Sequence, residues 1–176
     1  PVERLRYGGD WSGAGAGRPC IAGEAWRWPG GQVFQFLSPA RESQISSNDA
    51  SCVLQVQMGR FRLLLPGDIG TKREQDLVKY WGDQLSADWL LAAHHGSRTS
   101  SSPALLKWVY PETIVVSSGY ANRFGHPHPQ VLQRLQQLGG TIFSTATHGA
   151  LEFKLSDGGD KVEATAFRQA TRRYWM

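Results

Sequence analysis

The sequence lacks the features that mark several specialised classes of protein. No apolar run approaches the roughly 20 residues that cross a bilayer as a helix, so no transmembrane segment is predicted. The opening residues, PVERLRY, contain no apolar signal-peptide core and no initiator methionine, and we expect the chain to be a segment of a longer protein. Its 176 residues, 40% hydrophobic and 19% charged, match one soluble globular domain or a large part of one.

Cysteine is also scarce, and the charge balance is only mildly basic. Cys20 and Cys52 lack the CxxC spacing of metal and redox motifs. They can pair if the chain is exported, but we favour a buried free thiol at Cys52, inside an apolar strand. A net charge of +4 fits attraction to a polyanion such as nucleic acid, and fits equally a basic surface with arginine-rich ends. Neither feature decides the compartment or the partner.

Hydrophobic periodicity predicts strands and helices that alternate through the middle of the chain. The predicted strands are a hairpin over 26–37 turned at 29–31, then 51–58, 61–65, 88–92, 113–117, 141–144, 150–155 and 162–167. The predicted helices are 71–85, 103–109 and 129–138, and 8–19 and 38–50 are predicted loops. Because strands and helices alternate from 61 to 144 while both ends are β-rich, the pattern predicts a layered α/β fold with sheets covered by helices.

Asp68 ends a run of leucines in the segment LLLPGD at 63–68. A Gly-Asp turn after a strand is common, and taken alone the residue is best explained as a turn. Ligand-bearing loops of α/β sheets also follow strand ends, however, and two histidines come one helix and one strand later. Carboxylate and imidazole groups together bind Zn²⁺ or Mn²⁺, so Asp68 is a candidate metal-bridging ligand.

His94 and His95 are the candidate partners of Asp68 at a metal. Adjacent side chains point in opposite directions on an extended backbone, so we expect one histidine to face the metal and the other to orient a ligand or contact substrate. The sequence does not distinguish the two. The candidate substrate-binding residues that follow are Ser97, Arg98 and Thr99, whose hydroxyls and cation suit a phosphate. By itself, that cluster is better explained as a solvated loop.

A third polar segment, NRFGHPHP at 122–129, places two histidines between stiffening prolines before a predicted helix. A helix N-terminus favours anions. His126 and His128 are therefore candidate catalytic groups, acting as general acid or as phosphate ligand. Asn122 and Arg123 are candidate substrate-binding residues of the same loop. The alternative interpretation is a rigid loop whose histidines are incidental.

These short motifs together resemble one family in their order and spacing. They are NDASCVL at 48–54, LLPGD at 64–68, HHGS at 94–97, SSG at 117–119 and NRFGHP at 122–127. The family is the metallo-β-lactamase-like domain of ComEC, the DNA internalisation-related competence protein, and the resemblance runs from about residue 20 to 155. HHGS followed by NRFGHP at this separation is a specific combination, whereas Gly-Asp alone is weak.

The resemblance implies an αββα sandwich with a metal site at one edge, and hydrolysis of phosphodiesters by a metal-activated water. It implies that Asp68 bridges two divalent ions, zinc or manganese, and that His94 or His95 completes the shell of one. In ComEC the domain is attached to a membrane channel that imports single-stranded DNA, and it is proposed to degrade the strand that is not imported. The implied partners are single-stranded DNA and the channel portion of the parent protein. The implied location is extracytoplasmic, in the periplasm, as a domain of a bacterial inner-membrane protein.

One departure from the family pattern concerns the metal ligands. Enzymes of this superfamily take most of them from a His-x-(His/Asp)-x-Asp-His motif in the first half of the fold, and no histidine precedes His94 here. We therefore expect 1–176 to be one domain, the C-terminal portion of an incomplete sandwich that is inactive by itself. A fragment, a truncated gene and a degenerate homologue all explain the absence, and we favour a fragment.

Three functions remain open from the sequence. The first is the nuclease half-domain of a DNA-uptake protein. The second is a non-catalytic basic module that guides DNA toward a channel, with salt-dependent binding and no metal requirement. The third is a related hydrolase that acts on a small phosphoester and shares the same site.

Overall fold

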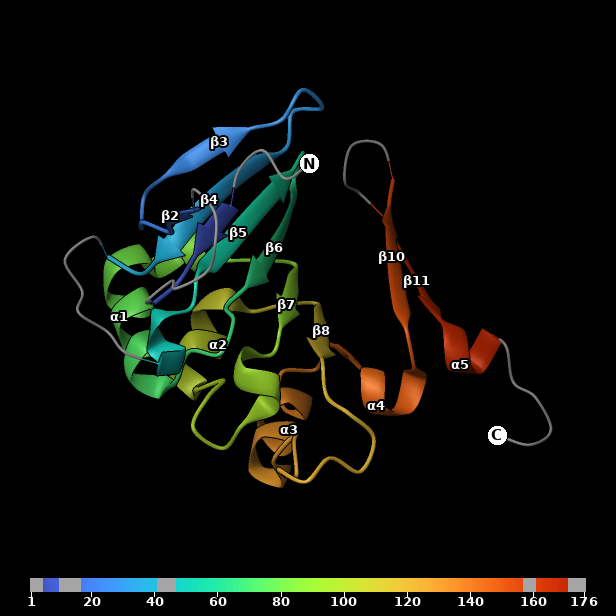
Figure 1. Ribbon diagram of the computed structural model, residues 1–176. Coiled ribbons are helices and arrows are strands. Elements are labelled where there is room, and N and C mark those ends of the chain that lie inside the picture. The colour runs from blue at the N-terminus through green and yellow to red at the C-terminus, as the bar shows by residue number, and fades with distance from the viewer. Residues whose placement is uncertain (1–4, 10–16, 41–46, 157–160, 171–176) are drawn as a thin grey trace.

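The computed structural model describes residues 5–9, 17–40, 47–156 and 161–170. A seven-stranded mixed sheet forms its centre, in the order β3-β4-β5-β6-β7-β8-β9 (Figure 1). The strands are β3 (Ala25–Arg27), β4 (Val33–Ser38), β5 (Val53–Met58), β6 (Phe61–Leu65), β7 (Trp89–Leu91), β8 (Thr113–Val116) and β9 (Thr141–Ser144). Pairing is antiparallel from β3 to β6 and parallel from β6 to β9. The α/β fold predicted from the alternating pattern is confirmed.

Three helices cover one face of this sheet: α1 (Thr71–Trp81), α2 (Pro103–Val109) and α3 (Pro129–Gln136). Leu64, Leu90 and Ile114 are register partners on that face and are at most 1% exposed. They belong to one buried cluster with the helix residues Leu77 and Leu105. The main core therefore lies between the helices and the sheet.

The opposite face of the sheet is also apolar, but no helix layer of the described residues covers it. Register partners on this face include Val56, Leu63 and Trp89, and further along Leu91, Val115 and Phe143. Most of them are only half-buried. A hairpin of β10 (Leu151–Leu155) and β11 (Val162–Ala166) packs against part of this face, where Phe153 meets both Trp89 and Phe143 edge-on at 5.4 Å.

Capping explains where two of the predicted helices begin. Pro103 and Pro129 occupy the first helical positions, where a missing N–H costs nothing. Ser102 accepts a hydrogen bond from Leu105 N at the start of α2. The predicted helix over 71–85 is shorter, because Gly82, with a φ of +49°, ends α1 and the 3-10 helix Gly82–Leu85 follows.

The predicted loops at 8–19 and 38–50 contain short regular elements where they are described. β2 (Gly17–Pro19) pairs in parallel with β1 (Leu5–Tyr7), and Ser47–Ala50 forms a 3-10 helix. Residues 10–16 and 41–46 of these loops lie outside the described residues. At the other end, the helical turns α4 (Thr145–His148) and α5 (Phe167–Ala170) flank the β10–β11 hairpin. No helix among the described residues is long and apolar enough to span a bilayer.

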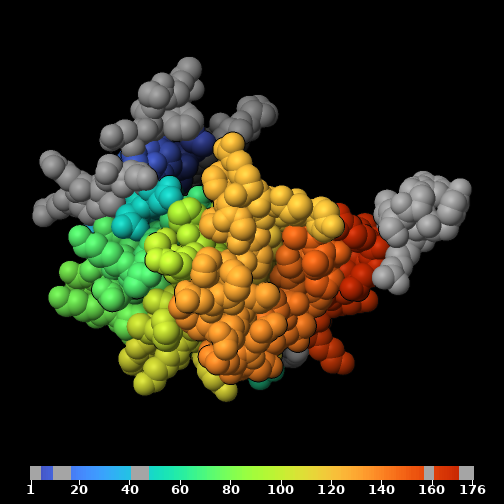
Figure 2. All heavy atoms as spheres, turned by 90° about the horizontal axis from the view of Figure 1, so that it is seen from below, coloured from blue at the N-terminus to red at the C-terminus, as the bar shows by residue number. Residues whose placement is uncertain are grey.

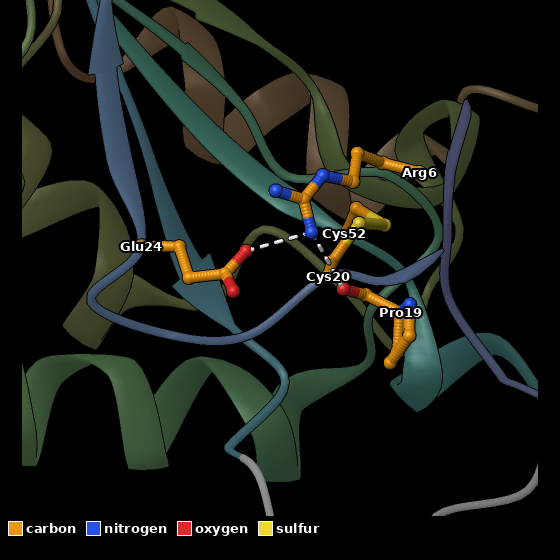
Figure 3. Close-up of a disulfide and its surroundings, with 5 residues drawn as sticks. All are labelled: Arg6, Pro19, Cys20, Glu24 and Cys52. Carbon is orange, nitrogen blue, oxygen red and sulfur yellow. Dashed lines mark hydrogen bonds and ion pairs between the residues drawn. A yellow bond between two sulfur atoms is a disulfide. The ribbon is translucent and has the colours of Figure 1, made fainter. Parts of the chain in front are cut away.

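The prediction of a free buried thiol at Cys52 is wrong, because Cys20 and Cys52 form a disulfide (Figure 3). Cys52 lies just before β5 rather than inside it, and the chain beyond β2 brings Cys20 within 5.7 Å, measured between Cα atoms. Arg6 lies beside this disulfide, where its guanidinium donates to Pro19 O and forms an ion pair with Glu24 at 2.9 Å (Figure 3). Spacing in the sequence could not show this contact between distant segments.

Candidate functional site

Three loops meet at the carboxyl ends of the neighbouring parallel strands β6, β7 and β8. Backbone bonds join them: His94 N donates to Gly67 O at 2.9 Å, and His128 N donates to Gly96 O at 2.9 Å. Gly96 also packs tightly against Pro127, since a Cβ at this glycine would lie 2.7 Å from the Cβ of the proline. Side chains that follow parallel strands gather at one edge of a sheet. The predicted site residues of all three loops therefore lie at the same edge.

Asp68 and His95 form a close pair of candidate ligands. His95 Nε2 lies 3.5 Å from Asp68 Oδ1, and His95 Nδ1 donates to Ser117 O at 2.8 Å. Because a carbonyl oxygen only accepts, this bond fixes the proton of the neutral ring on Nδ1. Nε2 is then the ring atom that faces the carboxylate, and a cation between the two atoms would bind both of them. The metal role of both residues remains a prediction that this geometry suits.

The backbone at His94 and His95 is not extended, so the premise that their side chains point in opposite directions is wrong. Their φ angles are +48° and +56°, in the left-handed region, within the 3-10 segment Ala93–Gly96. The tight turn that leads into Gly96 causes this conformation. The two ring centroids lie 6.4 Å apart. This distance places both imidazoles in one cluster. His94 Nε2 also accepts a hydrogen bond from Asn48 Nδ2 at 3.3 Å.

His126 joins this cluster from the β8–α3 loop. Its ring centroid lies 6.0 Å from that of His94. Within the described part of the chain, His126 Nδ1 is buried and meets no hydrogen-bond partner. Burial lowers the pKa of this imidazole below its ordinary 6.5, and the neighbouring His94, His95 and His128 lower it further. His126 is therefore largely neutral at pH 7, with a free buried ring nitrogen.

Asn122 holds His126 in place. Asn122 Nδ2 donates to His126 O at 2.6 Å and to Gly119 O at 3.0 Å, while Asn122 Oδ1 accepts from His126 N at 3.0 Å. His128 is the N-cap of α3, because its Nδ1 accepts a hydrogen bond from Gln130 N at the start of this helix. The amide of Asn122 is thus occupied by its own loop, and its substrate-binding role stays a prediction.

The other predicted substrate-binding residues lie on the loops around the cluster. Ser97 Oγ and Thr99 Oγ1 are hydrogen-bonded at 3.3 Å, and Arg98 between them is exposed. Arg123 is also exposed, with its guanidinium carbon 4.8 Å from the ring centroid of Phe124. Two exposed cations therefore lie on separate loops at the edge of the sheet that carries the histidines.

Three residues before β5 support the site, and the sequence reasoning gave them no role. Asp49 Oδ1 accepts from Gly70 N at 2.8 Å, and Ser51 Oγ accepts from Asp68 N at 3.1 Å. Asn48 donates to His94, as described above. The motif NDAS was recognised as a pattern, but only the fold shows that it binds the backbone of the loop that carries the carboxylate.

Glu74 also holds a loop of the site, the one that follows the two histidines, and the sequence did not predict this role. This carboxylate of α1 is fully buried and accepts from the backbone N–H groups of Ser101 and Ser102, the latter at 2.7 Å. Burial raises the pKa of Glu74 above its ordinary 4.5, against the opposing effect of these hydrogen bonds and of Arg134. Helical spacing places position 74 on the same face as Leu77 and so offered a signal for its burial.

The described residues bring two possible metal ligands together, Asp68 and His95, but not the three or more side chains of a complete site. Nowhere in the described ranges do three or more His, Cys, Asp or Glu side chains surround a point suited to a metal ion. The chemistry of the donors fits zinc or manganese, and the unpartnered Nδ1 of His126 is a further free ligand atom. Their number does not fit, because a catalytic metal usually needs three protein ligands. These residues by themselves do not form a metal site.

The chain is similar in sequence to segments of bacterial competence proteins, as its motifs predicted. It is 41% identical over 155 residues to "Competence protein ComA" of Neisseria gonorrhoeae, covering 88% of this chain and 22% of that protein. It is 38% identical over 130 residues to "Recombination protein 2" of Haemophilus influenzae, covering 74% of this chain and 16% of that one. It is 32% identical over 121 residues to "ComE operon protein 3" of Bacillus subtilis, with coverages of 69% and 16%.

The chain thus spans about a fifth of the length of these relatives. No protein-family model matches it. Among solved structures, it is similar to a "putative zn-dependent hydrolase of the metallo-beta-lactamase superfamily" from Thermotoga maritima, with a TM-score of 0.43 and 11% identity, covering 75% of this chain and 68% of that one. A likeness at this level carries no argument about function.

Proposed function

We propose that this chain is part of a metal-dependent nuclease domain of a DNA-uptake protein, which degrades the DNA strand that is not imported. One observation supports the proposal: in a chain similar in sequence to competence proteins, Asp68, His94, His95 and His126 lie close together at one edge of the sheet. The domain would act outside the cytoplasmic membrane, next to the channel portion of the parent protein.

The apolar sheet face opposite the helices supports the idea of an incomplete sandwich. Leu54, Leu63 and Leu91 lie on this face and are only half-buried. A layered α/β domain buries the apolar face of its sheet against another layer, so leucines that are only half-buried leave room for a packing partner. The proposed partner is the other layer of an αββα sandwich, from elsewhere in the parent protein, and that layer would bring the missing metal ligands.

A divalent metal in the complete site would activate water for attack on a phosphodiester. The residues of this chain have tasks of their own. Asp68 and His95 would provide donor atoms that Ser51 and Ser117 hold in position. His126, held neutral by its lowered pKa, can accept a proton or bind a cation. The exposed cation of Arg98 would bind a phosphate of the strand.

A non-catalytic DNA-guiding module is the second candidate function. One observation favours it, namely that Arg98 and Arg123 are both exposed on neighbouring loops, where they can bind phosphates. Such a module would bind DNA without metal, and its affinity would fall steeply with salt concentration. The two candidates therefore differ in their metal dependence.

The test uses the parent protein that contains this chain, with a fluorescent single-stranded DNA substrate. Cleavage is measured with added zinc or manganese and again after chelation, and bound metal is counted by elemental analysis. Asp68→Asn is expected to lower the cleavage rate by at least about 100-fold, because a charged ligand is lost. Asp83→Asn, which changes an exposed carboxylate outside the three loops, is the matched control.

The proposal fails if Asp68→Asn cleaves DNA at the rate of the unchanged protein. It also fails if chelation leaves cleavage intact. DNA binding that requires salt-sensitive contacts but no metal, with no cleavage in any condition, would identify the guiding module instead.

A further inference from the structure

The loop from β8 to α3 exposes two aromatic side chains beside the histidine cluster. Tyr120 is 79% exposed and Phe124 is 67% exposed. Figure 2 shows this part of the chain, in amber, standing out from the surface. Aromatic rings contribute strongly to binding when they are covered, so their exposure next to a candidate site points to a ligand.

The exposure follows from a fixed loop conformation. The amide of Asn122 closes the loop internally through its bonds to Gly119 and His126. At the root of the loop, Ser118 N donates to Thr145 Oγ1 at 2.9 Å. Because the polar groups of the loop bind one another, the aromatic side chains are left on its outer surface.

The rings of this loop lead directly to the candidate site. The guanidinium carbon of Arg123 lies 4.8 Å from the Phe124 centroid. Phe124 lies nearly parallel to His126, with an interplanar angle of 22° and a centroid distance of 5.9 Å. His126 in turn lies 6.0 Å from His94. A ligand that rests on Phe124 would therefore touch a cation and adjoin the histidines.

We propose that Phe124 is a base-stacking site for single-stranded nucleic acid, with Arg123 binding an adjoining phosphate. The inference rests on the proposed nuclease function and names how its substrate is held. Every nucleobase has a flat π-face, so an exposed ring beside an arginine binds strands of any sequence. In a duplex the bases are covered by their neighbours, so stacking at Phe124 selects unpaired strands. Tyr120 supplies a second exposed ring on the same loop.

The test measures binding rather than cleavage, by fluorescence anisotropy of the parent protein in the presence of a chelator. The labelled probes are a thymidine 20-mer, an abasic 20-mer with the same phosphates, and a duplex of the same length. Phe124→Ala is expected to weaken binding of the thymidine probe by roughly 5- to 150-fold, the range for one lost stacking contact. Binding of the abasic probe should stay unchanged.

Two further variants separate stacking from a change in loop shape. Phe124→Trp should restore the affinity for the thymidine probe, because it restores a π-face. Tyr80→Ala is the matched control, since this tyrosine of α1 is 72% exposed and lies outside the loop. It should bind all three probes as the unchanged protein does.

Equal weakening of the thymidine and abasic probes by Phe124→Ala would overturn the proposal, as would tighter binding of the duplex than of the single strand. The chelator makes the outcome independent of the nuclease assay. A protein that never cleaves DNA but prefers bases over abasic phosphates refutes the proposed nuclease function alone. A protein that cleaves DNA without this preference refutes the stacking site alone.

Discussion

Replacing Cys20 and Cys52 with alanine is expected to destabilise the fold strongly, because their disulfide closes a long loop. The two residues are 32 positions apart. In the chain-entropy model, a cross-link over this length restricts the unfolded chain enough to add about 3.7 kcal/mol to the free energy of unfolding. For a urea slope of roughly 2 kcal/mol per molar, the midpoint of unfolding should fall by about 2 M.

The same variant should loosen the site, because Cys52 follows directly after the segment that binds the Asp68 loop. Ser51 accepts from Asp68 N, and Asp49 accepts from Gly70 N. Hydrogen exchange of the backbone amides of Asp68 and Gly70 should therefore be faster in the variant. The amide of Ala92, which donates to Val115 O on the next strand, is the internal reference, and its exchange rate should rise less.

Reduction of the unchanged chain with a thiol reagent should reproduce both effects, which excludes a cause in the alanine side chains themselves. Unfolding of the variant within about 1 kcal/mol of the oxidised chain would refute the loop-closure reasoning. Unchanged exchange at Asp68 N would refute the link between the disulfide and the site.

Three other changes test separate parts of the structure. Glu74→Gln should cost about 1–3 kcal/mol of stability in urea unfolding, because one buried N–H loses its acceptor. Folding raises the pKa of Glu74, so above pH 4.5 the folded chain keeps a proton on this carboxyl that the unfolded chain has lost. The free energy of unfolding therefore falls as the pH rises above 4.5, and the stability difference between the unchanged chain and Glu74→Gln should shrink with it. Asn122→Ala should cost about 1.5–4.5 kcal/mol of stability and broaden the His126 resonances in NMR spectra, because three hydrogen bonds of the loop are lost. Leu90→Ala should cost about 2–5 kcal/mol, and Leu54→Ala on the half-buried face less than about half as much, unless the parent protein supplies a covering layer.

Much of the fold could be predicted from local patterns. The helix over 103–109 was predicted from apolar spacing with the bounds that the structure has, and the structure adds that Ser102 caps its start. The hairpin over 26–37 and the strand at 61–65 follow from turn residues and leucine runs in the same way. The disulfide was not predicted, since it joins segments that only the tertiary fold brings together.

The candidate site was predictable as a set of residues but not as a geometry. Strand ends identified Asp68, His94 and His95, because ligand loops follow parallel strands. The left-handed backbone at the two histidines and the close packing of Gly96 against Pro127 were not predicted, because no local pattern reports either of them. Supporting contacts at Asp49 and Ser51 were hidden for the same reason, since each joins positions about twenty residues apart.

The composition of the cluster suits cation binding better than the attraction of phosphates. Imidazole is largely uncharged near pH 7, and the pKa of His126 is lowered further by burial and by its neighbours. A surface that only attracts phosphates would gain more from lysine or arginine, which stay charged. Imidazole nitrogens beside the carboxylate of Asp68 instead suit the binding of a cation, and the buried Nδ1 of His126 has no hydrogen-bond partner among the described residues. The charged side chains of Arg98 and Arg123 lie on the loops around this cluster, where they can bind an anion such as a phosphate.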